Sequence, residues 1–196
     1  MMKNDAVSAL HDDIAACKLC AAHLSLGPRP VVRFSASARI LIIGQAPGLK
    51  VHQSGVPWDD NSGDRLREWT GLSKDVFYDE SRVALVPMGF CYPGKGSSGD
   101  LPPRKECAPQ WHGSIMKLLP ASRLTLLVGS YAQAYYLKDD PRNMTDKVRA
   151  FQSFLPRFLP LPHPSWRSTK WMKDNAWFAS EVLPVLRDEV RKCLTR

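Results

Sequence analysis

Four of the five cysteines are spaced in a way that predicts a metal centre. Cys17 and Cys20 form a Cys-x2-Cys pair, whereas Cys91 and Cys107 are separated by 15 residues rich in Pro and Gly. Thiolates that folding brings together hold zinc or iron–sulfur clusters. The long second spacing differs from the short knuckles of a zinc ribbon, so it favours a 4Fe-4S cluster over zinc. Burial as small hydrophobic side chains is the remaining alternative, and Cys193, alone in a charged helical pattern, is not expected to be a ligand.

Residues suited to binding or catalysis follow several short apolar runs. The turn 44–48 reads Gly-Gln-Ala-Pro-Gly, and its small residues let backbone N–H groups approach a ligand. His163 lies in the sequence Pro-His-Pro-Ser after another apolar run, where an imidazole N–H could stabilise a leaving anion. A tight turn without function and a structural histidine are the ordinary alternatives at these two places.

Aromatic and basic residues in two loops predict contact with nucleic acid. Trp58 is followed by polar residues, which favours base stacking over burial in the core. Trp166, Arg167 and Lys170 form a second group, with a composition suited to gripping phosphates and filling the gap left by an extruded base. A solvated loop leading into a helix would have a similar composition.

Apolar periodicity predicts the elements that must position these residues. Short apolar runs predict strands at 38–43, 83–86, 124–128 and 158–161. Longer patterns predict helices at 6–16, 62–72, 108–118, 130–137 and 171–194, with Ser62 as an N-cap and a kink near Pro184. We therefore expect one α/β domain over residues 1–196, with a short four-stranded, mainly parallel sheet sandwiched between helices. The loops after its strands would gather at one end of the sheet, where open α/β folds bind ligands.

Composition and charge narrow the function further. A chain of 196 residues with 44% hydrophobic content can bury one good core. It contains no apolar run long enough to span a membrane and no signal-peptide stretch, so we expect a cytoplasmic protein without membrane contact. The formal charge of +8 suits a polyanion partner, although a solvated basic face would give the same excess. We expect a monomer.

The motifs together resemble one known family. The turn 44–48, the segment Gly-Val-Pro-Trp-Asp-Asp-Asn-Ser-Gly-Asp at 55–64 and the Pro-His-Pro-Ser motif at 162–165 occur in the order and spacing of the uracil-DNA glycosylase superfamily. With the four cysteines, the chain resembles the iron–sulfur branch, families four and five, over about residues 15–186. The resemblance implies a monofunctional glycosylase of base excision repair that hydrolyses the N-glycosidic bond of uracil or another deaminated base in DNA. A non-catalytic module of the same fold that binds damaged bases in DNA is the alternative.

The resemblance also implies roles for individual residues. His163 would stabilise the departing base, Asp60 would guide water, and Gln45 would bind a base carbonyl through its backbone. The substrate-binding set is Gly44, Gln45, Ala46, Pro47, Gly48, Trp58, Asp64 and Ser165, with Asp64 also the alternative to Asp60. DNA contacts would come from Trp166, Arg167 and Lys170, and a 4Fe-4S cluster would be held by Cys17, Cys20, Cys91 and Cys107.

Two positions depart from the pattern of the family. The turn 44–48 carries no acid, whereas related families have Asp or Glu there, so Asp60 becomes the leading water-handling residue. The strand 83–86 is followed by Pro87 and Met88, where strict uracil readers have an Asn whose amide pairs with the base. Neither side chain can read a Watson–Crick edge. Strict specificity for uracil is therefore not expected, and a deaminated purine or a wider base range is the alternative.

Overall fold

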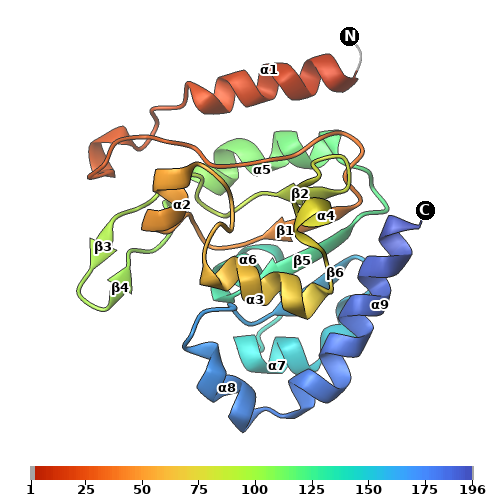
Figure 1. Ribbon diagram of the computed structural model, residues 1–196. Coiled ribbons are helices and arrows are strands. Elements are labelled where there is room, and N and C mark those ends of the chain that lie inside the picture. The colour runs from red at the N-terminus through yellow and green to blue at the C-terminus, as the bar shows by residue number, and fades with distance from the viewer. Residues whose placement is uncertain (1–2, 196) are drawn as a thin grey trace.

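A parallel sheet of four strands forms the centre of the computed structural model, which describes residues 3–195. The strand order is β2 (Val83–Leu85), β1 (Ile40–Ile43), β5 (Leu124–Val128) and β6 (Phe158–Leu161), and each neighbouring pair is parallel (Figure 1). Nearly all of these residues are apolar and buried, because helices cover both faces of the sheet. The fold class predicted from the sequence is confirmed.

Helices and short helical turns connect the strands. The helices are α1 (Lys3–Ala15), α2 (Leu49–Ser54), α3 (Asn61–Thr70), α4 (Lys74–Tyr78), α5 (Cys107–Leu118), α6 (Ser130–Tyr136), α7 (Met144–Arg149), α8 (Ser168–Asp174) and α9 (Leu183–Leu194). The smaller elements are the 3-10 turns Ala21–His23 and Phe151–Phe154, the π-helical turn Phe178–Val182 and the hairpin strands β3 (Lys95–Gly96) and β4 (Gly99–Asp100). Among residues 3–195, no helix has the length and apolar character needed to span a membrane.

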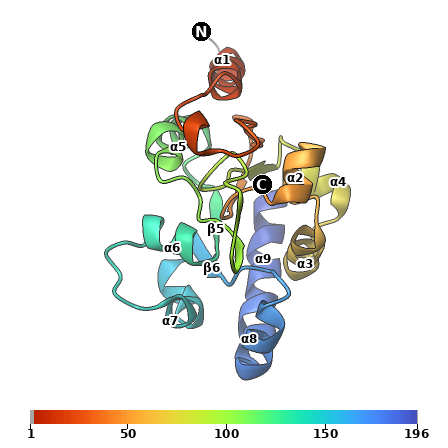
Figure 2. The ribbon, with the colours of Figure 1, turned by 90° about the vertical axis from the view of Figure 1, so that its left-hand side faces the viewer.

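Successive strand residues point into two different cores. Ile40 and Ile42 of β1 pack with apolar residues of α3, α7 and α9. Leu41 and Ile43 point to the other face and pack with residues of α1, α5 and α6. Figures 1 and 2 show α1 and α5 on one side of the strands and α3 and α9 on the other. Because both faces of the sheet are buried, the sequence of each strand is a nearly continuous apolar run.

Two helix ends differ from the sequence predictions. Asp60, and not Ser62, caps α3: its Oδ1 accepts a hydrogen bond from the backbone N–H of Gly63 at 2.9 Å. The C-terminal helix does not run unbroken from residue 171, because α8 ends at Asp174 and a π-helical turn precedes α9. The interruption predicted near Pro184 is present, because the π-helical turn Phe178–Val182 ends directly before α9, where Pro184 lies in the first turn.

The carboxyl ends of the parallel strands lie at one edge of the sheet. The chain leaves β1 at Gly44, β5 at Gly129 and β6 at Pro162, and the β3–β4 hairpin follows β2. The loops that carry the candidate residues therefore meet at this edge, which is where open α/β folds place their ligands.

Candidate active site

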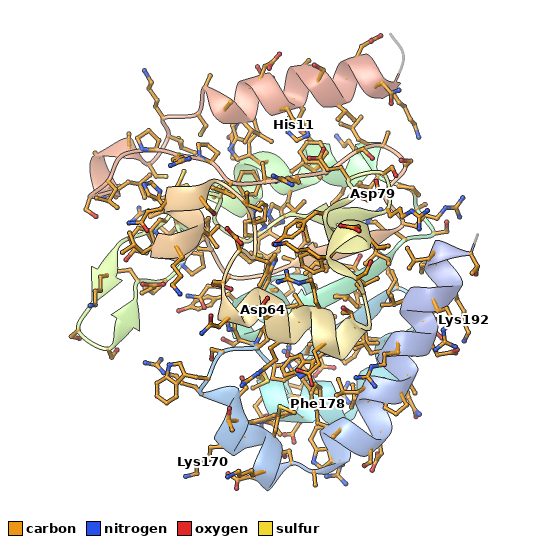
Figure 3. All side chains as sticks on the ribbon, viewed as in Figure 1. His11, Asp64, Asp79, Lys170, Phe178 and Lys192 are labelled. Atoms are coloured by element: carbon orange, nitrogen blue, oxygen red, sulfur yellow. The ribbon has the colours of Figure 1, made fainter. Side chains whose placement is uncertain are left out.

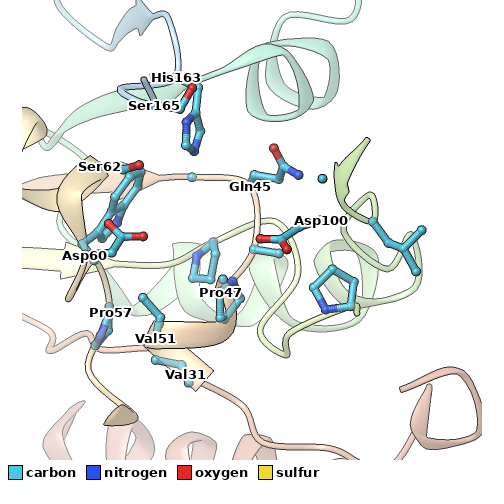
Figure 4. A pocket seen from close by; sticks show the side chains of 18 of the residues that line it. Val31, Gln45, Pro47, Val51, Pro57, Asp60, Ser62, Asp100, His163 and Ser165 are labelled. Carbon is cyan, nitrogen blue, oxygen red and sulfur yellow. The ribbon is translucent and has the colours of Figure 1, made fainter. Parts of the chain in front are cut away.

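A cleft of about 510 Å³ opens at the carboxyl ends of the strands (Figure 4). Its walls come from the turn 44–48, the segment 57–62, the loop 163–167 and the β3–β4 hairpin. These segments include most of the residues predicted to bind substrate: Gly44, Gln45, Ala46, Pro47, Gly48, Trp58, Asp60, His163, Ser165, Trp166 and Arg167. The structure thus brings together residues that lie up to about 120 positions apart in the sequence, as strand-end loops of one sheet edge.

The turn 44–48 is fixed against the loop that follows β2. The carbonyl of Gly44 accepts from the N–H of Met88 at 2.9 Å, and that of Gln45 accepts from the N–H of Gly89 at 3.0 Å. Within the described part of the chain, the backbone N–H groups of Gln45 and Ala46 donate to no protein acceptor. They are therefore available to a carbonyl of a bound base.

Trp58 is held in an unusual backbone conformation at the centre of the site. Its φ is +58°, a region that non-glycine residues rarely occupy. A Cβ on Gly44 would lie 2.5 Å from Cζ2 of the indole, and one on Gly63 would lie 1.8 Å from the Trp58 carbonyl oxygen, so both neighbours must be glycine. The half-buried indole also packs against the core next to α3. Trp58 therefore serves both as core and as cleft wall, two roles that the sequence left as alternatives.

His163 faces Trp58 and Asp60 across the inner end of the cleft. The imidazole stacks near the indole of Trp58, with ring centroids 5.9 Å apart and an interplanar angle of 30°. Burial lowers the pKa of His163 below its usual 6.5, and the nearby Asp60 carboxylate opposes this shift only in part. At neutral pH the ring is therefore uncharged and can donate through one N–H. Figure 4 shows His163 and Asp60 on the same side of the cleft as Ser62.

Asp64 is not brought to the cleft. It lies on the outer face of α3, its side chain is 75% exposed, and it pairs with Arg67 one turn along the helix (Figure 3). Asp60 is the one of the two candidate carboxylates that lines the cleft. Its Oδ1 is engaged by the helix cap, which leaves Oδ2 free to face the cleft.

The basic loop borders the cleft mouth only in part. Trp166 is 78% exposed, and the guanidinium of Arg167 lies 5.5 Å from its ring centroid. Arg167 also donates a hydrogen bond to the carbonyl of Ser98 at the tip of the β3–β4 hairpin. Lys170 lies farther along, on α8, and does not line the cleft. Of the predicted DNA-binding residues, Arg167 thus has a partner inside the protein.

Pro87 lines the cleft where the strict uracil readers carry an Asn, whereas Met88 is buried. A carbonyl can only accept, so Nε2 of His112 donates to the Pro87 carbonyl at 2.9 Å, and Nδ1 accepts from the hydroxyl of Tyr136 at 2.6 Å. Burial lowers the pKa of His112 to about 4. This neutral histidine holds the floor of the cleft in place.

Asp100 is a cleft residue that sequence reasoning missed. It is the last residue of β4, paired with Lys95 of β3, and its side chain accepts a hydrogen bond from the hydroxyl of Tyr92 at 3.3 Å. The local sequence Gly-Ser-Ser-Gly-Asp reads only as a turn. The single available signal was the position of this turn between Cys91 and Cys107.

The four predicted ligand cysteines line one small cavity together with apolar residues such as Pro30, Phe90 and Trp111. Sγ of Cys107 accepts a hydrogen bond from the N–H of Phe90 at 3.3 Å. Burial raises the pKa of the Cys91 thiol to about 11 and that of Cys107 to about 12. Among residues 3–195, no three His, Cys, Asp or Glu side chains are arranged to hold a single metal ion.

A comparison with known protein families bears on the identity of the cleft. The sequence model of the uracil DNA glycosylase superfamily matches residues 32–187. The matched region contains the whole central sheet and the four segments that form the cleft walls, but it begins after Cys17 and Cys20. The match therefore concerns the fold and the cleft. The chain belongs to the uracil DNA glycosylase superfamily.

Proposed function

We propose that the protein is a monofunctional DNA glycosylase that hydrolyses the N-glycosidic bond of uracil or another deaminated base. The observation that carries this proposal is the position of the neutral His163 imidazole beside Asp60 in a cleft large enough for an extruded base. A glycosylase must take its target base out of the duplex before it can act on it. A cleft at the strand ends, with free N–H groups in the turn 44–48, suits such a base.

His163 provides the largest expected contribution to the rate. Breaking the glycosidic bond leaves negative charge on the base, and an N–H already aimed at that charge lowers the barrier. The backbone at His163 is held by two neighbours, because Gly129 lies in van der Waals contact with its Cβ and Ser168 donates a hydrogen bond to its carbonyl. Burial that keeps the imidazole neutral also keeps the surrounding dielectric low, which strengthens the bond to the anion.

Asp60 is suited to guide the attacking water. Because the helix cap engages Oδ1, the carboxylate is held in one orientation with Oδ2 available. Water as the nucleophile fits the lining of the cleft, which over residues 3–195 includes no lysine that could form a Schiff base. This is the basis for proposing hydrolysis without a lyase step.

DNA is the substrate implied by membership of the superfamily, and the charge of +8 supports binding to it. The exposed Trp166 at the cleft mouth is placed to enter the gap that an extruded base leaves. Lys170 would add a phosphate contact beyond the cleft.

We further propose that Cys17, Cys20, Cys91 and Cys107 hold a 4Fe-4S cluster with a structural role, as in the iron–sulfur branch of the superfamily. Their common cavity and the N–H of Phe90 directed at Cys107 support a cluster, since N–H···S bonds are typical of such sites. Protein purified without oxygen should be brown and contain iron; a colourless protein with stoichiometric zinc would favour the zinc alternative.

The cleft lacks an acid in the turn 44–48 and an Asn at Pro87, and these two absences favour a second candidate, a module that binds damaged bases without cleaving them. One assay separates the two. Oligonucleotides carrying uracil, hypoxanthine, xanthine or an unmodified base are incubated with the protein and then treated with alkali, which breaks the strand at abasic sites. Strand breaks at a lesion support the glycosylase, whereas tight lesion binding without breaks supports the module.

A further inference from the structure

The cleft contains a second carboxylate that the proposed mechanism does not use. Asp100 lies on the β3–β4 hairpin, and a Cβ on Gly48 would be 3.4 Å from its Oδ2. Figure 4 shows its carboxylate beside the turn that carries Gln45 and Pro47, on the other side of the cleft from Asp60. The two carboxylates therefore border the space for the base from opposite sides.

The hairpin is held so that this carboxylate stays at the cleft. The Tyr92 hydroxyl donates to Oδ1 of Asp100 at 3.3 Å, and the N–H of Leu101 donates to the carbonyl of Gly94 at 2.8 Å. At the tip, Arg167 donates to the carbonyl of Ser98. Two contacts at the base of the hairpin and one contact from the loop 163–167 at its tip thus hold it in this position.

A carboxylate at this place opposes the binding of DNA, so its presence calls for a role at the base. The cleft mouth must accept a polyanion, and a negative charge there repels phosphates. Pro87 and Met88, at the end of β2, offer no side-chain hydrogen bond to the base. Discrimination among bases must therefore come from another residue of the cleft.

We propose that Asp100 selects deaminated bases by accepting a hydrogen bond from their ring N–H, an inference that rests on the proposed glycosylase function. Uracil, hypoxanthine and xanthine each carry a ring N–H beside a carbonyl. An ionised carboxylate can only accept, so it pairs with this N–H, while the adjacent backbone N–H groups of Gln45 and Ala46 pair with the carbonyl. Cytosine and adenine present a ring-nitrogen lone pair at the corresponding position, which the carboxylate repels.

Asp100 should affect discrimination among bases more than the rate of cleavage. As the glycosidic bond breaks, the base becomes negative and its N–H becomes a weaker donor to a carboxylate. The bond to Asp100 is therefore no stronger in the transition state than in the bound substrate, and such an interaction does not raise kcat. Loss of Asp100 should weaken the binding of lesion DNA and reduce discrimination, with little change in the single-turnover rate at saturation.

The test compares uracil with 3-methyluracil and cytosine in otherwise identical oligonucleotides. Binding is measured in a His163→Ala background, so that cleavage does not consume the substrate, and cleavage is measured in the wild-type background. Asp100→Ala should reduce the preference for uracil over 3-methyluracil about tenfold, the usual effect of a hydrogen bond to a charged group. Asp100→Asn keeps an acceptor oxygen and should retain part of the preference. Asp75→Asn, the same change at an exposed position on α4, is the matched control and should change nothing.

Each outcome bears on one proposal or the other. An unchanged preference in Asp100→Ala, or a wild type that binds cytosine or 3-methyluracil as tightly as uracil, would overturn the role of Asp100. If wild type cleaves no lesion but prefers uracil in a manner that depends on Asp100, the glycosylase proposal fails and the selection role stands. Thermal melting of each variant shows whether the fold is retained, and Tyr92→Phe, which removes only the hydroxyl, provides a second and milder change at the same contact.

Discussion

In the cleft, close packing of the backbone positions the functional side chains. In the cysteine cavity, the cysteine side chains must instead hold together the backbone segments that carry them. Gly44 and Gly63 bring the end of β1 and the α3 turn so close to Trp58 that no other residue fits easily. The four cysteines instead come from the loop after α1, the loop after β2 and the start of α5, and burial raises the pKa of the Cys91 and Cys107 thiols. The cleft is preorganised and needs little further ordering. The cysteine cavity is expected to become stable only when it binds its metal centre.

The β3–β4 hairpin connects the two regions. Cys91 and Cys107 lie on either side of it in the sequence, and Asp100 and the Ser98 carbonyl reach the cleft side. Damage at the cysteine cavity should therefore reach the cleft through this hairpin. Damage at the cleft should leave the cysteine cavity intact, and this asymmetry is open to direct tests.

The largest expected effect comes from removing a predicted cluster ligand. Cys91→Ser or Cys107→Ser should lose the metal, and the free energy of unfolding should fall by more than about 3 kcal/mol, because metal binding energy is part of the folding energy at such a site. Metal analysis and chemical denaturation measure both effects. Cys193→Ala, at a buried position of α9, is the control and should keep full metal content. A stable, fully metallated Cys107→Ser protein would contradict the assignment.

Changes inside the cleft should affect catalysis and leave the metal in place. His163→Ala should lower the single-turnover cleavage rate about a hundredfold or more. Asp60→Asn should cost less, since Asn still caps α3 and only the charge at the water site is lost. Asp64→Asn, on the outer face of α3, should behave as wild type. A silent Asp60→Asn together with an inactive Asp64→Asn would show that the water-handling residue is misassigned.

Acid should destabilise the floor of the cleft through His112. Its pKa is about 4 in the folded protein and about 6.5 when unfolded, so between these values the unfolded chain binds the extra proton. The contribution of His112 to the free energy of unfolding is complete above pH 6.5 and is lost as the pH falls toward 4. The loss is about 3 kcal/mol at most. The lowered pKa of His163 acts in the same direction. Urea denaturation at pH 7, 5.5 and 4.5 measures this change in the free energy of unfolding. The free energy of His112→Gln should depend less steeply on pH than that of wild type. An equal dependence on pH in both proteins would exclude His112 as the cause.

The smallest effect concerns DNA affinity outside the cleft. Lys170→Gln should weaken binding to all DNA and reduce the slope of log affinity against log salt by about 0.9, the value for one phosphate contact. Arg167→Gln should in addition loosen the β3–β4 hairpin and reduce base selection, because Arg167 binds the Ser98 carbonyl. Salt titrations with uracil and undamaged oligonucleotides separate these two effects. Identical titrations for Lys170→Gln and wild type would mean that α8 does not meet DNA.

The sequence predicted those parts of the molecule in which local pattern and structure agree. The strands predicted at 38–43, 83–86, 124–128 and 158–161 are observed at 40–43, 83–85, 124–128 and 158–161, and the loops after them form the cleft. The sequence predictions were wrong where a single contact determines the local structure. Asp60 rather than Ser62 caps α3, which depends on which oxygen reaches the Gly63 N–H, and Asp64 faces away because of its register on the helix. Asp100 could not be found, since a hairpin of two short strands has no periodic signal and only the fold brings it to Gly48.

We propose that the cleft hydrolyses the glycosidic bond of a deaminated base. Mass spectrometry of a uracil oligonucleotide after a single turnover with wild type and with His163→Ala tests this directly. We expect free uracil and an intact strand with one abasic site from wild type, and nearly unreacted oligonucleotide over the same time from His163→Ala. Release of base at equal rates by both proteins, or no release by wild type from uracil, hypoxanthine or xanthine oligonucleotides, would contradict it.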